Sequence, residues 1–422
     1  MNTEAETAIA EAAKTVALRP GASDEPRVPA HPDLVWRAIR DCGTRLWLDT
    51  GDIEEAARLW TAEFEALTTN NTLLNREVQK GIYDELVREA AAALRAAAPD
   101  IDERRLLLEI AFVLNARHGL TLARRFGAYV SVELHTDLAD DVERTVAYGR
   151  RYHEVCPERF IVKVPLSPAG LIGARRLSDA GIPVNFTLGF SARQNVLAAL
   201  VARPAYVNVF MGRLNAFVSD HRLGDGLNVG EKATLAAQRE LLNLRRVGAA
   251  SSRLIGASMR EGSQVGALAG VDVFTMPPKV AAEYRAHPLP RPSSRLHDEL
   301  AVALAPGVAL SDFAGATLWE TAGPLRAAAA ELGRENPRTL TPERIVRRLA
   351  QAGAADVFPA WTPEDIAAAD RGGKIPVYAH WKDRLAAGRI GLDALMNLAA
   401  FRSFAADQAA FDERVRRLIS AR

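Results

Sequence analysis

Short apolar runs alternate with longer amphipathic stretches from residue 45 to about residue 278. Runs rich in Val, Ile, Leu and Phe favour buried strands. The stretches between them repeat apolar residues at helical spacing, as Ile53, Ala56 and Trp60 do after the helix-capping Asp52. The pattern predicts strands at 45–49, 66–69, 128–134, 160–165, 182–187, 205–210, 253–258 and 271–275. It predicts helices at 72–97, 102–117, 169–180 and 192–200.

Eight strands that alternate with helices over ~230 residues match a TIM (β/α)8 barrel, which typically takes about 250 residues. We therefore expect an α/β fold with the barrel at 44–287, an N-terminal extension at 1–43 and a helical C-terminal extension at 288–422. Residues 4–16 read as a weak alanine-rich helix before a Pro- and Gly-rich linker, which predicts a partly disordered, mobile tail. The C-terminal extension reads as mostly helical from residue 295, with starts at Thr341-Pro342 and Thr362-Pro363, and is expected to pack on the barrel.

Polar residues stand near the end of nearly every predicted strand. In a β/α barrel these ends meet at one face, where such folds carry their active sites. A barrel core without a site would show polar groups there only sporadically, so the pattern predicts a catalytic rim. The candidate residues are Asp49, Thr68, Asn70, Glu133, Lys163, Asn185, Thr187, Asn208, Arg213, Ser258 and Arg260.

Lys163 is the centre of this set because it lies inside the apolar run 160–165. Only 7 of the 53 basic residues are lysine, so a lysine at this position indicates chemistry that arginine cannot perform. Burial disfavours the charged form of an amine and is expected to lower the pKa of Lys163 toward neutrality. A neutral amine in a pocket can form a Schiff base with a carbonyl. The alternative is a structural lysine that extends its ammonium group to solvent.

Composition narrows the class of protein. The formal net charge is +1, which gives no reason to expect binding to nucleic acid or to an acidic membrane surface. Cys42 and Cys156 are the only cysteines, so neither a disulfide framework nor a thiolate metal site is expected, and the cytoplasm is favoured. Residues 1–18 do not have the pattern of a signal peptide, and no apolar run approaches the ~20 residues of a membrane helix.

Seven segments, in order along residues 46–278, resemble the transaldolase family. They are Leu48-Asp49-Thr50-Gly51-Asp52-Ile53, Thr68-Thr69-Asn70, Val130-Ser131-Val132-Glu133, Ile161-Val162-Lys163-Val164-Pro165, 181–188, Phe210-Met211-Gly212-Arg213 and 256–260. The resemblance implies a class I aldol transfer that needs no metal or cofactor, sugar-phosphate substrates, and a place in the pentose phosphate pathway. A homo-oligomer is compatible with it.

The resemblance also implies a role for each candidate residue. Lys163 would form an imine with a ketose phosphate, and Asp49 would take the proton of the C4 hydroxyl as a dihydroxyacetone unit is cut off. Glu133 and Thr187 would position the water of imine formation. Substrate-binding roles would fall to Thr68, Asn70, Asn185, Asn208 and Phe210, and phosphate-binding roles to Arg213, Ser258 and Arg260.

Three structural alternatives accompany these roles. Asp49 or Asn70 could each cap the helix that follows, and Arg213 and Arg260 could form surface ion pairs. Asn71 and Asn208 depart from the family pattern, which usually has proline and serine at the corresponding places.

Two rival functions follow from the same residues. One is a fructose-6-phosphate aldolase that releases free dihydroxyacetone, and the other is a barrel that binds sugar phosphate without turnover. Related aldolases carry glutamine and tyrosine where this chain has Glu133 and Phe210, so these two residues favour transfer.

Overall fold

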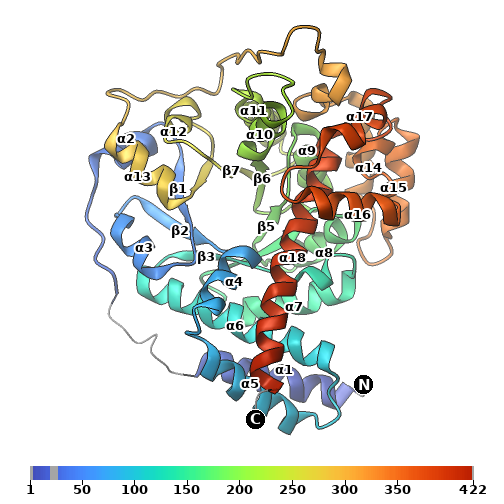
Figure 1. The fold of residues 1–422 in the computed structure, drawn as a ribbon. Helices are drawn as coiled ribbons and strands as arrows, with labels where there is room; N and C mark the ends of the chain where they lie inside the picture. Colours follow the sequence, from blue (N-terminus) through green and yellow to red (C-terminus); the bar gives the residue numbers. More distant parts are fainter. Residues whose placement is uncertain (1–2, 20–26, 421–422) are drawn as a thin grey trace.

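The computed structural model describes residues 3–19 and 27–420. Within these residues, eight parallel strands close into a barrel in chain order, with β8 bonded to β1 (Figure 1). The predicted TIM barrel is confirmed, and strand ends differ from the predicted ones by at most two residues. The strands are β1 (Arg45–Asp49), β2 (Phe64–Thr68), β3 (Tyr129–Glu133), β4 (Phe160–Pro165), β5 (Val184–Thr187), β6 (Tyr206–Phe210), β7 (Arg253–Ala257) and β8 (Val273–Met276).

The register of the strands determines which polar side chains lie opposite one another in the barrel. Asp49 lies opposite Thr68, and Lys163 lies between Glu133 on one side and Asn185 on the other. Asp49, Thr68 and Glu133 are the last residues of their strands, and the pairing places Lys163 and Asn185 beside Glu133, so residues far apart in the sequence come together in the barrel.

Helices surround the barrel and cover its outer face. They are α3 (Ile53–Leu59), α4 (Asn71–Gln79), α5 (Asp84–Ala97), α6 (Glu103–Phe126), α7 (Val142–Val155), α8 (Pro168–Asp179), α9 (Ala192–Val201), α10 (Met211–Asp220), α11 (Val229–Arg246), α12 (Ser263–Ala267) and α13 (Pro278–Ala286). The single helix predicted at 72–97 is wrong, because the chain breaks between α4 and α5 at Gly81, where φ is +82°. Such a left-handed conformation suits glycine and ends a helix.

Helix α6 is long and apolar enough to cross a membrane, and among the described residues it is the one helix that passes that test. Within the fold, 89% of its apolar window is buried. Its apolar surface is therefore already covered by protein, since it packs against β3, α5 and α1.

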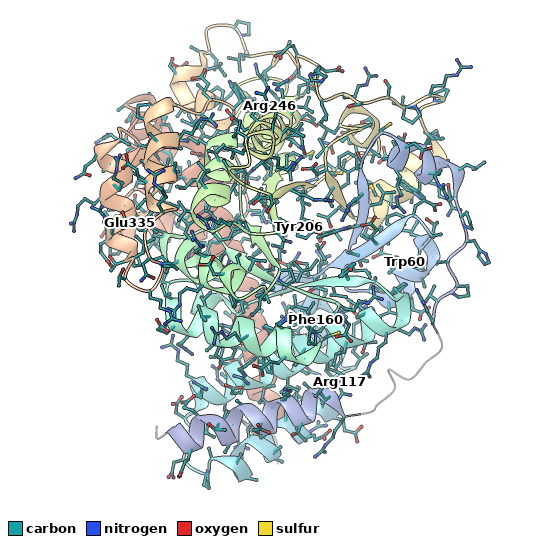
Figure 2. The ribbon with its side chains drawn as sticks, turned by 180° about the vertical axis from the view of Figure 1, so that it is seen from behind. Trp60, Arg117, Phe160, Tyr206, Arg246 and Glu335 are labelled. Atoms are coloured by element: carbon teal, nitrogen blue, oxygen red, sulfur yellow. The ribbon has the colours of Figure 1, made fainter. Side chains whose placement is uncertain are left out.

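The N-terminal extension folds onto the barrel. Helix α1 (Thr3–Leu18) packs on α5 and α6 with Ile9, Ala13 and Ala17 fully buried, and Arg117 of α6 donates to the carbonyl oxygens of Val16 and Ala17 at 2.6 and 2.8 Å (Figure 2). The expected mobile tail is thus wrong for residues 3–18, because their apolar stripe meets a surface that only the tertiary fold creates. The predicted linker at 20–26 lies outside the described residues. Helix α2 (Leu34–Asp41) follows it.

The C-terminal extension consists of α14 (Gly323–Leu332), α15 (Pro342–Gln351), α16 (Pro363–Gly372), α17 (Tyr378–Ala386) and α18 (Leu392–Ser420). The two helix starts predicted from Thr-Pro pairs are confirmed, since Thr341 and Thr362 cap α15 and α16. Residues 295–322, expected to be mostly helical, instead form loops with the short 3-10 turns η3 (Leu310–Phe313) and η4 (Gly315–Leu318). Helix α14 packs on α9, so this extension does pack on the barrel.

Helix α18 runs from the ends of β4 and β5 to α4 and α5, as Figure 1 shows in red. Near its start, Arg193 of α9 forms a paired contact with Asp393 at 2.7 and 2.8 Å. One turn later, Asn397 Nδ2 donates to the carbonyl oxygens of Leu166 and Leu188, just beyond β4 and β5, at 3.2 and 2.9 Å. At the far end, an ion pair joins α18 to α5. This helix is therefore fixed across the face of the barrel where the predicted site lies.

Candidate active site

A cavity of about 600 Å³ opens at the C-terminal ends of the strands. Ten of the twelve predicted site residues line it, and they come from β1, β2, β4, β5 and β6 or from the segments that follow β2, β6 and β7. They are Asp49, Thr68, Asn70, Lys163, Asn185, Asn208, Phe210, Arg213, Ser258 and Arg260. The other two, Glu133 and Thr187, do not line the cavity and are buried, with 3% and 0% of their surface exposed.

Lys163 lies at the floor of this cavity. Strand β4 is buried along its whole length, and Lys163 is only 4% exposed. Its Nζ donates to the carbonyl oxygen of Thr69 at 3.1 Å and lies 3.5 Å from Oε2 of Glu133. The alternative of a lysine that extends to bulk solvent is therefore wrong. The amine is enclosed, held in place, and open only toward the cavity.

Glu133 is the carboxyl group nearest to that amine. Its Oε2 also accepts a hydrogen bond from the backbone N–H of Asn71 at 3.3 Å. Burial raises the pKa of Glu133, and Lys163 and the Asn71 N–H oppose that rise. A carboxyl group whose pKa is lifted toward working pH can both give and take a proton, which imine formation requires.

Asp49 faces the cavity from the end of β1. Its Oδ1 accepts a hydrogen bond from Thr68 Oγ1 at 2.9 Å, and Thr68 Oγ1 lies 2.5 Å from Oγ1 of Thr275. Burial raises the pKa of Asp49, opposed first by Lys163 and then by the Thr68 hydroxyl. The helix-cap alternative for Asp49 is wrong, because Asp52 caps α3 by accepting from Glu55 N at 2.9 Å. Asp49 is therefore available as a base.

Asn185 and Thr187 are buried polar residues of β5. Asn185 Nδ2 donates to Ser131 Oγ at 3.0 Å, which fixes the amide and directs its Oδ1 away from that bond. Within the part of the chain that the structure describes, Asn185 Oδ1 and Thr187 Oγ1 are buried without a hydrogen-bond partner. Buried polar atoms without partners are costly and are found where a ligand or water completes them. Asn185 lies opposite Lys163 and Thr187 lies opposite Pro165, two residues further along β4.

Asn70 and Asn208 use their carbonyl oxygens within the protein. Asn70 Oδ1 accepts from Leu73 N at 2.8 Å, so the alternative that it caps α4 is confirmed, although the residue also lines the cavity. Asn208 Oδ1 accepts from Gly189 N at 3.1 Å. Each residue therefore has only its amide NH₂ group left to donate to a substrate oxygen.

Arg213, Ser258 and Arg260 form a cationic wall of the cavity. The backbone N–H of Gly212 donates to the carbonyl oxygen of Ser258 at 3.1 Å, and a Cβ atom at residue 212 would lie only 2.2 Å from that oxygen. Only glycine allows this approach, which places Arg213 beside Arg260. The surface ion-pair alternative is wrong for Arg213, which is 6% exposed and makes no ion pair within the described residues.

Arg213 lacks a partner for part of its guanidinium group. Its Nη1 is buried without a hydrogen bond among the described residues. Burial and then Arg260 lower the pKa of Arg213 to about 10, with Asp407 opposing them. A buried guanidinium beside a second cation is completed by an anion, and phosphate fits its fork of donors.

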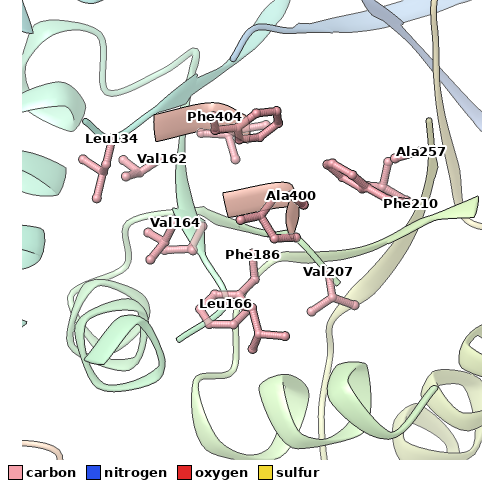
Figure 3. Close-up of a cluster of buried hydrophobic side chains, with 14 of the residues drawn as sticks. Leu134, Val162, Val164, Leu166, Phe186, Val207, Phe210, Ala257, Ala400 and Phe404 are labelled. Carbon is pink, nitrogen blue, oxygen red and sulfur yellow. The ribbon is translucent and has the colours of Figure 1, made fainter. Parts of the chain in front are cut away.

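Further residues that the sequence did not single out also line the cavity, among them Arg76, Thr275, Lys374 and Phe404. The ring of Phe404, on α18, lies 6.0 Å from Lys163 Nζ and 5.6 Å from Arg213 Cζ. Figure 3 shows Phe404 and Ala400 on this helix, close to the strands that carry Val162, Val164 and Phe210. Thr275 is at the end of the predicted strand 271–275, so its position could have indicated a place in the site. The sequence around Lys374 and Phe404 contains no such indication.

Comparison with known proteins shows that this chain matches one protein family. Residues 46–311, more than half of the chain, match the family model described as transaldolase/fructose-6-phosphate aldolase. A Thermus thermophilus protein named "Probable transaldolase" is 35% identical over 248 residues, which cover 58% of this chain and 92% of that protein. A "Transaldolase" of Xanthomonas oryzae pv. oryzae (strain PXO99A) is 29% identical over 268 residues, covering 61% of this chain and 78% of that protein.

Proposed function

Because the chain belongs to the transaldolase/fructose-6-phosphate aldolase family, we propose that it is a transaldolase acting through an imine on Lys163. It moves a dihydroxyacetone unit from a ketose phosphate, fructose 6-phosphate or sedoheptulose 7-phosphate, to an aldose phosphate, as in the pentose phosphate pathway. The observation that carries the proposal is the enclosed amine of Lys163, 3.5 Å from the Glu133 carboxyl group and open to a cavity that Asp49 also faces.

The first step joins the substrate to the protein. The nitrogen of Lys163 adds to the C2 carbonyl carbon of the ketose phosphate, and a proton passes from that nitrogen to the carbonyl oxygen, which becomes a hydroxyl group. Glu133 gives a proton to that hydroxyl, which leaves as water, and a C=N bond forms between the substrate and Lys163. The raised pKa of Glu133 favours this role because a carboxyl group must be protonated to act as the acid.

The second step breaks the C3–C4 bond. Asp49 takes the proton of the C4 hydroxyl, whose oxygen then forms the carbonyl of the departing aldose phosphate. The electrons of the broken bond move to C3 and into the C=N group, which leaves a three-carbon enamine on Lys163. A second carboxyl group, on a different strand from Glu133, suits this division of labour, since one proton goes to the oxygen on C2 and the other comes from the oxygen on C4.

The third step reverses the second with a new aldehyde. The enamine carbon attacks the carbonyl of the acceptor, Asp49 returns its proton to the new hydroxyl, and water then hydrolyses the imine. Arg213, Ser258 and Arg260 hold the phosphate of donor and acceptor alike, so both sugars place their reacting carbons over Lys163. The Asn70, Asn185 and Asn208 amides bind hydroxyl groups along the chain.

Product formation with and without an acceptor tests this proposal. Fructose 6-phosphate plus erythrose 4-phosphate is expected to give sedoheptulose 7-phosphate and glyceraldehyde 3-phosphate, and fructose 6-phosphate alone is expected to give little free dihydroxyacetone. Lys163→Arg keeps the charge and abolishes turnover, because a guanidinium cannot form the imine. Equal release of dihydroxyacetone with and without acceptor identifies an aldolase instead, and no product in either case identifies a binding protein.

A further inference from the structure

We infer that Lys374 is a third phosphate-binding residue of this cavity, so that the C-terminal extension completes the substrate site. The family match ends at residue 311, so this lysine belongs to the part of the chain that the match does not cover. The inference deepens the proposed function and rests on it for the identity of the sugar, but the phosphate subsite itself is tested separately below.

Lys374 reaches the cavity from the loop between α16 and α17. It directly follows Gly372 and Gly373, and Gly373 adopts a φ of +65° that side chains rarely tolerate. Lys374 lines the same cavity as Lys163, Arg213 and Arg260. The glycine pair turns the chain at the end of α16 and directs the lysine to the cavity mouth.

Both ends of this loop are fixed to the barrel face. Arg402 of α18 forms a paired contact with Asp370, near the end of α16, at 2.7 and 2.9 Å. At the other end, the backbone N–H of Tyr378 donates to His221 Nε2 at 3.1 Å, directly after the helix α10 that carries Arg213. The loop is therefore held over the cationic wall rather than hanging free.

Cations outnumber anions around Lys374. Burial lowers the pKa of Lys374, and Arg213, Arg76 and Arg260 lower it further, with Asp407 opposing them. Asp407, which accepts a hydrogen bond from Thr72 Oγ1, is the one carboxylate named among these influences, against three arginines. No ion pair joins these four cations to a carboxylate in residues 3–19 and 27–420. Cations gathered in this way repel one another until a negative ligand enters.

A phosphate dianion matches this arrangement. Arg213 and Arg260 offer planar forks of donors, and a lysine adds a compact charge with three rotatable donors. Arg213 Nη1, buried without a partner, supplies an independent sign that a ligand belongs at this place. Together the three cations can contact all three terminal oxygens of a sugar phosphate.

Calorimetric titration of the full chain with inorganic phosphate and with fructose 6-phosphate tests the inference. Lys374→Gln is expected to weaken both affinities roughly tenfold to one-hundredfold, the usual range for losing a hydrogen bond to a charged group. The matched control is Lys382→Gln, an exposed lysine on α17 that does not line the cavity, and it should bind as the wild type does. Lys374→Arg should restore most of the affinity, and melting curves of all variants check folding.

Failure of the inference is distinguishable from failure of the proposed function. If Lys374→Gln binds both ligands as tightly as the wild type, the inference is overturned, whether or not the protein turns over sugar phosphates. If the protein has no transaldolase activity but Lys374→Gln still loses phosphate affinity, the subsite stands and only the reaction is wrong. In kinetics, the same variant should raise KM for fructose 6-phosphate and leave the reaction of unphosphorylated fructose unchanged.

Discussion

Two buried carboxyl groups face the same amine, and their surroundings differ. Asp49 is held by a threonine hydroxyl, whereas Glu133 is held by a backbone N–H that exists only because residue 71 is not proline. Both pKa values are raised by burial and both are opposed by Lys163. Each hydrogen bond stabilises the charged form of its carboxyl group, so removing either bond should raise the corresponding pKa further.

The Thr68 hydroxyl is expected to set the acid limb of activity. Asp49 acts as a base only when deprotonated, so kcat/KM falls as pH drops through its pKa. Thr68→Val removes a bond that lowers this pKa, and the limb should move to higher pH with a several-fold loss of activity on the acid side. Thr68→Ser keeps the hydroxyl and serves as the control in pH profiles. An unchanged limb in Thr68→Val would show that Asp49 is not the group that titrates.

Asn71 offers a similar test at Glu133. Asn71→Pro suits the first position of α4 but deletes the N–H that contacts the carboxylate. The pKa of Glu133 should rise, and the pH dependence of imine formation, followed by reductive trapping, should shift to higher pH. Asn71→Ala is the matched control because it keeps the N–H and loses a side-chain amide whose Nδ2 has no hydrogen bond within the described residues. Identical profiles for the proline and alanine variants would rule out this role of the backbone.

At the scale of elements, α18 is a structural part of the cavity. Its start is fixed to α9 by Asp393, its middle contributes Phe404 to the cavity wall, and Arg414 near its end forms an ion pair with Asp84 of α5 at 2.6 Å. Phe404 is 5% exposed and packs toward Phe210 with ring centroids 6.5 Å apart. An aromatic side chain so close to Lys163 would keep bulk water from the proposed imine.

Phe404 should therefore influence the fate of the three-carbon intermediate. Phe404→Ala opens space over Lys163, and water should then compete better with the acceptor for the bound dihydroxyacetone unit. We expect the ratio of released dihydroxyacetone to transferred product to rise severalfold, measured with fructose 6-phosphate at fixed acceptor concentration. Phe404→Leu, which keeps an apolar cover, should stay close to the wild type. A ratio that does not change in the alanine variant would contradict a shielding role.

At the scale of the whole molecule, the barrel could be predicted because each strand is a short apolar run with a polar end. The same alternation, read together with the family resemblance, pointed to ten of the residues that line the cavity. Helix α1 was misjudged because alanine-rich helices have weak patterns, and the stripe of Ile9, Ala13 and Ala17 acquires meaning only against α5 and α6. The break at Gly81 is a different case, since glycine is itself a local signal for the end of a helix.

The missing part of the site has a different cause. Lys374 and Phe404 lie more than 200 residues after Lys163 in the sequence. Local sequence patterns do not predict contacts between residues so far apart in the chain. The residues around Lys374 indicate only the end of a helix, and those around Phe404 indicate only an ordinary helix face. Only the closed fold, with α18 crossing the barrel rim, reveals them as parts of the site.

The central claim is that Lys163 bonds covalently to the carbonyl carbon of a sugar phosphate. Borohydride reduction in the presence of fructose 6-phosphate, followed by peptide mass spectrometry, tests it most directly. We predict a reduced three-carbon adduct on the peptide that contains Lys163 and none on Lys163→Arg. An intact wild type that binds fructose 6-phosphate but yields no adduct at Lys163, or yields it on another lysine, would contradict the account.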